Sequence, residues 1–208
     1  MASEVDICNI ALGKLGANPI ATFLDGTTEA NLCGLQYPIL RDAVLAARAW
    51  TFATTRLQIT SGIPPDPIPS GWGYAYLVPN DSLRIIQAYV PNPAGAVIQY
   101  IDTQFDAIYT QIDWERLIDY LYTNQGPTIW VKYIRRVTDT SKFDPNFIEA
   151  LATRIAMELA IPITNNPALL DGYTKLYSAK IIEATSTEGQ QGKSQVIQQP
   201  GTLAARRV

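Results

Sequence analysis

The chain has 208 residues, of which 47% are hydrophobic and 17% are charged, so it is long and apolar enough to bury a substantial core. Its net charge of -3 argues against a dedicated nucleic-acid binder, which usually presents a basic face. The absence of histidine excludes Ser-His-Asp triads, Cys-His pairs and histidine-containing zinc sites.

Two helices are predicted before residue 51. Ser3 followed by Asp6 resembles a capping box, and apolar residues at helical spacing lead from there to Gly16, a natural helix stop. A second helical pattern follows a loop and fades at about Trp50. Pro38 lies inside this second pattern, and we expect it to kink or divide the helix, because proline lacks the N–H that bonds backward.

Residues 51–142 predict a β-rich region. Short stretches of β-branched and aromatic residues alternate there with Pro, Gly, Asn and Asp. Five such stretches are predicted to be strands: 51–60, 72–79, 83–90, 96–101 and 128–137. Because helices do not alternate with these strands, the pattern favours a small antiparallel sandwich or barrel.

Two segments interrupt the predicted strands. Residues 62–71 contain four prolines, which is typical of an extended loop. In residues 110–123, four apolar side chains recur at helical spacing, and this segment is predicted to be a short helix or a turn; they are Trp114, Leu117, Ile118 and Leu121.

Two further helices and a tail complete the chain. Asp144-Pro145 is a start signal, because Asp caps helices and Pro fits the first helical position. Pro162 is expected to end this third helix, and Asn166-Pro167 repeats the start signal for a fourth. Residues 185–208 are poor in large apolar side chains and are predicted to form a flexible C-terminal arm.

This order of elements predicts an α+β fold in which an antiparallel β-rich domain, 51–142, is inserted into a four-helix bundle. The bundle would be formed by 1–50 and 143–184, because no single helical pair can bury its apolar face in water. Trp50 and Phe52 are predicted to pack at the domain junction. The side chains expected to fill the helical core are Cys8, Leu12, Leu15, Ile39, Leu40, Val44, Leu151, Ile155, Leu159, Tyr173 and Tyr177.

No catalytic, cofactor or metal site is expected. The sequence has no phosphate-binding loop, dinucleotide-binding glycine pattern or Cys-x-x-Cys motif. Asp113 and Glu115, near Asp119, are two residues apart and would face different ways on a helix, which argues against paired acid–base chemistry. Cys8 and Cys33 lie in apolar helical patterns and are predicted to be buried thiols, a disulfide between them being the alternative.

Residues 7–56 are similar to the opening of the tail tubular protein A family, the head-to-tail adaptors of short-tailed bacteriophages and related prophages. The shared pattern is N-x-A-L-x-x-L-G, then T-E-A…C, then R-D-x-x-L…W-x-F-A. The matching residues are Asn9, Ala11, Leu12, Leu15, Gly16, Glu29, Ala30, Cys33, Tyr37, Arg41, Asp42, Leu45, Trp50, Phe52 and Ala53. Residues 147–184 resemble the paired C-terminal helices of that family, and the middle resembles it only in being β-rich.

The resemblance implies a structural virion protein without enzymatic activity or cofactor. Such adaptors form a ring, commonly a dodecamer, between the portal protein of the head and the tail nozzle, or tubular protein B. They often seat the tail fibres, and during genome ejection DNA passes through their lumen without specific binding. The implied location is the head–tail interface of the virion, after synthesis in the host cytoplasm. No apolar run reaches membrane-span length, so no membrane partner is expected.

The arm is the segment proposed to bind the portal, because a basic pair on a mobile terminus can dock onto an acidic or carbonyl-lined surface. The residues in question are Thr202, Leu203, Arg206, Arg207 and Val208. Low charge with 11 tyrosines fits either a surface covered by partners or a compact monomer with half-buried rings. The alternative function is an interaction module of another phage tail or baseplate assembly.

Overall fold

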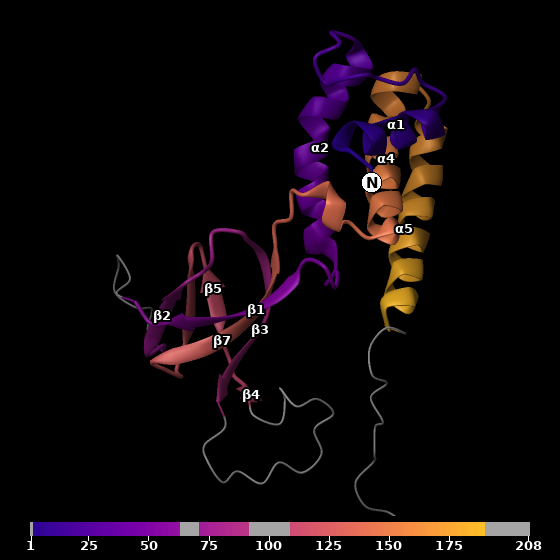
Figure 1. Ribbon diagram of the computed structural model, residues 1–208. Helices are drawn as coiled ribbons and strands as arrows, with labels where there is room; N and C mark the ends of the chain where they lie inside the picture. Colours follow the sequence, from indigo (N-terminus) through magenta and orange to yellow (C-terminus); the bar gives the residue numbers. More distant parts are fainter. Residues whose placement is uncertain (1, 63–70, 92–108, 190–208) are drawn as a thin grey trace, which may run out of the picture.

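The computed structural model describes residues 2–62, 71–91 and 109–189. Within these ranges the chain is mixed α+β, with four α-helices and two antiparallel sheets, so the predicted fold class is confirmed at this level. The helices gather at one end of the molecule and the strands at the other (Figure 1). The predicted strand at 96–101, most of the proline-rich loop and residues 190–208 of the arm lie outside the described residues.

The helices are α1 (Glu4–Leu15), α2 (Thr28–Ala47), α4 (Pro145–Thr164) and α5 (Pro167–Gly189). The capping box at α1 is confirmed, since the Ser3 hydroxyl accepts from the Asp6 N–H at 3.1 Å and the Ser3 N–H donates to the Asp6 carboxylate at 2.8 Å. Gly16 ends α1 in the left-handed region, at φ 70°. At α4, the Asp144 carboxylate accepts from the Asn146 N–H at 2.8 Å.

Of the two outcomes expected at Pro38, a kink or a division, division does not occur, because α2 is one continuous helix. Two helix ends also differ from expectation. Pro162 does not end α4, which continues to Thr164, where Asn165 adopts a left-handed cap at φ 52° and donates to the Ile161 carbonyl at 2.9 Å. A proline in the last turn removes only one backward hydrogen bond, so buried side chains earlier in α4 keep the turn helical. Helix α5 runs on to Gly189, into the segment expected to begin the arm.

The strands are β1 (Thr54–Thr60), β2 (Tyr74–Leu77), β3 (Ser82–Pro91), β4 (Tyr109–Gln111), β5 (Glu115–Leu117), β6 (Tyr120–Thr123) and β7 (Thr128–Arg135), and a 3-10 turn, η1 (Thr140–Lys142), precedes α4. One sheet has the order β1-β7-β3-β4 and the other β2-β6-β5, with every pair antiparallel. The β-rich part of the chain is therefore built from two sheets.

The predicted helix or turn over residues 110–123 is wrong as a helix, because the segment forms β4 and the β5–β6 hairpin. Leu117 pairs with Tyr120 across a two-residue turn in which Ile118 has φ 54°. Strand β6 also pairs with β2, from a distant part of the sequence. These ladder hydrogen bonds and the burial of Leu121 override the helical spacing of the apolar residues.

The buried side chains form two clusters. One joins the four helices to the start of the β-rich part and to the end of β7, and the other fills the space between the strands. Of the predicted helical core, the buried members are Cys8, Leu12, Leu40, Val44, Leu151, Ile155 and Leu159, and the partly buried ones are Leu15, Tyr173 and Tyr177. Ile39 is 65% exposed, so its assignment to the core is wrong: it lies on the opposite side of α2 from the buried Cys33 and Tyr37.

The connection from α2 to β1 is a tight turn packed with aromatic rings. Trp50 is fully buried, and its indole N–H donates to the Val44 carbonyl at 2.9 Å. The Trp50 ring contacts the Phe147 ring of α4 edge-on, with 5.1 Å between centroids. The Phe52 ring also contacts the Phe147 ring, with 5.2 Å between centroids. The Trp50 carbonyl accepts from the Thr54 N–H at 2.8 Å, which turns the chain into β1. These contacts place Trp50 and Phe52 where the helices meet the strands.

Candidate interaction surfaces

One side of α2 is exposed and apolar. Its exposed residues from Asn31 to Ala47 include no charged side chain, and Leu35 and Ile39 are 70% and 65% exposed. Asp42 lies on the same side, but its carboxylate is paired with Arg41 at 2.8 Å and with Arg136 at 2.7 Å. A mostly apolar stripe of this length, with a single paired carboxylate in it, is typical of a surface that another molecule covers.

Helix α5 also exposes two large apolar side chains. Ile182 is 70% exposed and Leu176 is 37% exposed, with the small Ala179 between them in sequence. Helix α4 packs against both α2 and α5, and Figure 1 shows α2 and α5 on opposite sides of it. The helical part therefore exposes apolar side chains on two helices that lie on opposite sides of α4.

The loop between α1 and α2 presents a single leucine to solvent. Leu24 is 94% exposed, although the loop around it is well held. Asn9 accepts from the Ile20 N–H at 2.8 Å and donates to the Ile20 carbonyl at 2.9 Å. The Asp25 carboxylate accepts from the N–H groups of Ala21 and Thr22 and from the Thr22 hydroxyl. These hydrogen bonds to Thr22 and Ala21 lower the pKa of Asp25 below its ordinary value of 3.8.

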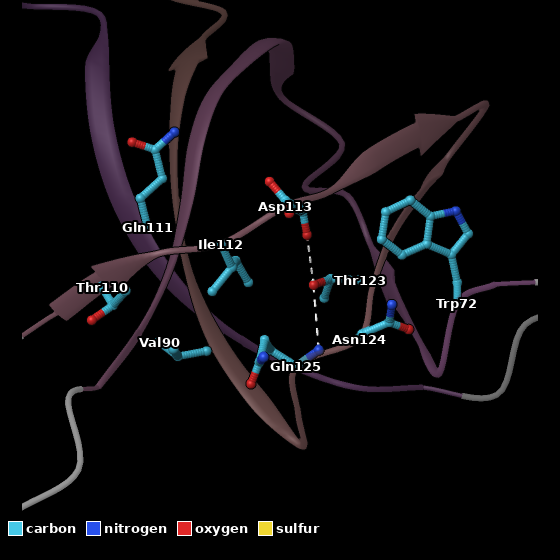
Figure 2. Close-up of a pocket in the computed structure, with 9 residues that line it drawn as sticks. All are labelled: Trp72, Val90, Thr110, Gln111, Ile112, Asp113, Thr123, Asn124 and Gln125. Atoms are coloured by element: carbon cyan, nitrogen blue, oxygen red, sulfur yellow. Dashed lines mark hydrogen bonds between the residues drawn. The ribbon is translucent and has the colours of Figure 1, made fainter.

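A pocket of about 400 Å³ lies in the β-rich part, where β3, β4 and the end of β6 meet. Figure 2 shows Trp72 at one side and Gln111 at the other, with Asp113, Thr123 and Gln125 between them. The lining residues are Trp72, Val90, Thr110, Gln111, Ile112, Asp113, Thr123, Asn124 and Gln125. They include one carboxylate and no lysine or arginine.

The carboxylates considered as candidate catalytic groups do not form a catalytic pair. Asp113 lines the pocket, whereas Glu115 on β5 accepts the indole N–H of Trp72 at 2.9 Å. Asp119 lies in the hairpin turn. Across the ranges that the structure describes, no group of three or more His, Cys, Asp or Glu residues is arranged to hold a metal ion.

The two cysteines are free thiols buried between helices. A hydrogen bond between the Cys8 and Cys33 side chains, together with burial, raises the pKa of Cys8 far above its ordinary value. Burial likewise raises the pKa of the nearby Tyr37 hydroxyl. Deep burial and a protonated thiol are typical of structural cysteines, as the sequence pattern predicts.

Sequence reasoning did not identify either the α2 surface or the pocket. On α2, the available signal was that apolar residues occur on two sides of the helix, since Leu35 and Ile39 cannot share a face with Cys33 and Tyr37. The pocket residues belong to no motif, because four separate segments bring them together. The proposed portal-binding residues, Thr202, Leu203, Arg206, Arg207 and Val208, lie outside the described residues.

No described helix combines the length and the apolar character needed to cross a membrane. Neither a protein-family model nor a curated protein matches the chain.

Proposed function

We propose that this protein is a structural virion component, a ring-forming adaptor that joins the portal protein of a bacteriophage head to the tail nozzle. The observation that carries the proposal is the exposed, mostly apolar side of α2, with Leu35 and Ile39 at its centre. The sequence pattern that resembles tail tubular protein A supports the same reading. DNA would pass through the ring, which a chain of net charge -3 favours by repelling phosphates.

The exposed apolar side chains of α2 and α5 fit a ring in particular. A contact between the α2 side of one copy and the α5 side of the next joins two different surfaces, and repetition of such a contact closes a ring when the rotation allows it. Leu35 and Ile39 on one copy would then be covered by Leu176 and Ile182 on its neighbour. Burying these side chains would gain roughly 25 cal/mol for each Å² of apolar surface removed from water.

The proposed architecture is a four-helix bundle interrupted by a β-rich domain. Its support is that one core cluster joins α1, α2, α4 and α5 although α2 and α4 are far apart in the sequence. Trp50 and Phe147 contact each other at the place where the chain passes from helices to strands. At the second connection, between β7 and α4, Arg136 pairs with Asp42 of α2 at 2.7 Å. Side-chain contacts therefore join the two parts at both connections.

Mixing the chain with a portal protein tests the proposal. We expect a complex with many copies of this chain on each portal ring, counted by native mass spectrometry and seen as an added layer in negative-stain images. A chain that stays monomeric when portal is present would contradict it. A closed oligomer that forms without binding portal would instead favour a module of another tail or baseplate assembly.

A further inference from the structure

The pocket in the β-rich part is built on a fixed backbone. The hydroxyl of Thr123, a fully buried residue, donates to the Asp113 carbonyl at 2.8 Å and accepts from the Gln125 N–H at 3.3 Å. The Tyr76 hydroxyl donates to the Gln125 carbonyl at 2.7 Å, and the Ile112 N–H donates to the Ala88 carbonyl at 3.1 Å. The backbone is therefore held in place, while the side chains of Asp113 and Gln125 stay exposed.

The charge of the lining restricts the ligand. Among the described residues that line it, the pocket has the carboxylate of Asp113 and no lysine or arginine, so a phosphate, sulfate or carboxylate group would meet a negative charge without a cationic partner there. This excludes nucleotides and acidic headgroups as well-matched ligands. A neutral ligand remains favoured, because most of the polar lining groups are uncharged amides and hydroxyls.

The hydrogen-bonding groups match a compound rich in hydroxyls. Asp113 only accepts hydrogen bonds, whereas Asn124 and Gln125 each offer both a donor and an acceptor, and these three side chains are exposed. Gln111 adds the donor of its amide group, and its amide oxygen accepts from Gln87 at 3.2 Å. Neighbouring hydroxyls on a sugar ring both donate and accept, so a planar amide or carboxylate can bond two of them at once. Val90 and Ile112 add apolar contact within the same pocket.

Trp72 supplies the flat apolar surface that such a ligand also needs. Its indole N–H is already bonded to Glu115 at 2.9 Å, which fixes the ring and leaves its faces for contact. The C–H groups on one face of a sugar ring pack well on an indole. A volume of about 400 Å³ lies within the range of small-molecule sites.

From these features we propose that the pocket binds a neutral saccharide. Trp72 is the stacking platform, and Asp113, Asn124 and Gln125 are the hydrogen-bonding residues. The interaction is binding alone, with no bond made or broken. This inference does not depend on the adaptor function, because it rests on a different part of the molecule.

Saturation-transfer NMR with the full chain tests the proposal, using maltose, cellobiose, lactose and N,N′-diacetylchitobiose as probes. We expect at least one disaccharide to bind saturably, with a dissociation constant of about 1 mM or tighter. Trp72→Ala should abolish the transfer and Trp72→Phe should keep part of it. Asn124→Ala should weaken binding about tenfold, as expected for one lost hydrogen bond. Gln58→Ala, on the exposed surface of β1, is the matched control and should leave binding unchanged.

Three results would overturn the saccharide site. One is the absence of transfer for all four disaccharides in a folded chain. Another is transfer that persists in both Trp72→Ala and Asn124→Ala. The third is Asp113-dependent binding of a lysine-containing peptide in place of any sugar, which would make the pocket a site for cationic peptides. The pocket variants should still join the portal complex, so failure here is distinct from failure of the proposed function.

Discussion

At the scale of single residues, the indole of Trp50 holds the helices to the start of the β-rich part. It combines complete burial, an edge-on contact with Phe147 and a hydrogen bond to Val44. Trp50→Ala should therefore cost about 3–5 kcal/mol of unfolding free energy, measured by urea denaturation, because it leaves a large cavity. Trp50→Phe keeps a ring but loses the hydrogen bond, worth about 1 kcal/mol, and should give an intermediate value. Equal stability of the alanine variant and the parent would contradict this role.

The Asp25 carboxylate provides a pH-dependent contribution to the same helical part. Its hydrogen bonds with Thr22 and Ala21 lower its pKa in the folded state below 3.8. A lowered folded-state pKa means that this stabilisation is present above pH 3.8 and is lost as the pH falls through the folded value. Asp25→Asn should therefore lower the melting temperature at pH 7 and make its decline in acid shallower.

Asp171→Asn is the control for that measurement, because Asp171 is an exposed carboxylate that pairs with Lys175 at 2.7 Å and such pairs contribute little. Its melting temperature should follow that of the parent at every pH. An acid decline in Asp25→Asn as steep as in the parent would show that the Asp25 hydrogen bonds do not stabilise the loop. Both variants should keep part of the acid sensitivity, because two other carboxylates also have a lowered pKa. Hydrogen bonds with Ser3 lower the pKa of Asp6, and hydrogen bonds with Ser141 lower that of Asp139.

At the scale of elements, the β5–β6 hairpin contains a residue that is poorly suited to its backbone. Ile118 has φ 54° at the first turn position and is 86% exposed. Such a backbone conformation favours glycine, and a β-branched side chain is strained in it. Ile118→Gly should raise the free energy of unfolding by about 0.5–1 kcal/mol, since relief of strain exceeds the entropy that glycine adds to the unfolded chain. Chemical denaturation measures this difference.

Ile118→Val is the matched control for the hairpin, because valine keeps the branch at Cβ and loses only an exposed methylene. Its stability should equal that of the parent within about 0.5 kcal/mol. A loss of stability in Ile118→Gly would mean that the exposed isoleucine makes favourable contacts within the chain. In that case the turn would be held by those contacts and not strained.

The same elements show which parts of the fold local sequence can predict. The starts of α1 and α4 depend on side chains within three residues of the cap, Ser3 with Asp6 and Asp144 with Asn146, so they are visible in the sequence. The β5–β6 hairpin depends on pairing with β2, more than forty residues earlier by the register of Leu77 with Tyr120. No local pattern reports that pairing, and the helical spacing around Leu121 gave the wrong prediction.

The candidate surfaces were less predictable than the fold. Ile39 follows the helical apolar pattern of α2, and only the packing of α4 against the other side shows that it is exposed. Trp72 and Asn124 come from segments that no motif links, so their meeting in one pocket follows from the sheet order alone. The apolar pattern of a sequence predicts which side chains are buried where one side of an element is apolar, and it fails where two sides are apolar.

At the scale of the whole molecule, the exposed side of α2 should matter for assembly and not for folding. The double variant Leu35→Glu, Ile39→Glu places two charges where the proposed neighbour would bury them unpaired. Its unfolding free energy should change by less than about 0.5 kcal/mol per site, because both side chains are largely exposed. Assembly on portal, followed by native mass spectrometry, should be lost.

Leu57→Glu controls for added charge in general, since Leu57 is 42% exposed on β1 in the β-rich part. This variant should form the same portal complex as the parent. If the double variant on α2 assembled normally, the contact between neighbours would have to lie elsewhere on the chain. If Leu57→Glu failed as well, the effect would reflect net charge and not the α2 surface.

The C-terminal segment gives a second test at this scale, with folding and attachment read out separately. Truncation after Gly189 keeps all of α5, including Ala184, which is buried against the helical core. The melting temperature should therefore stay close to that of the full chain.

Portal binding of the truncated chain should weaken, because the proposed contacts of Arg206 and Arg207 are removed, whereas association between copies through α2 should persist. The double variant Arg206→Gln, Arg207→Gln, which removes both positive charges, should reproduce the binding defect in a chain of full length. Truncation that lowers the melting temperature would place the segment within the fold, and truncation that leaves portal affinity unchanged would remove it from the portal interface.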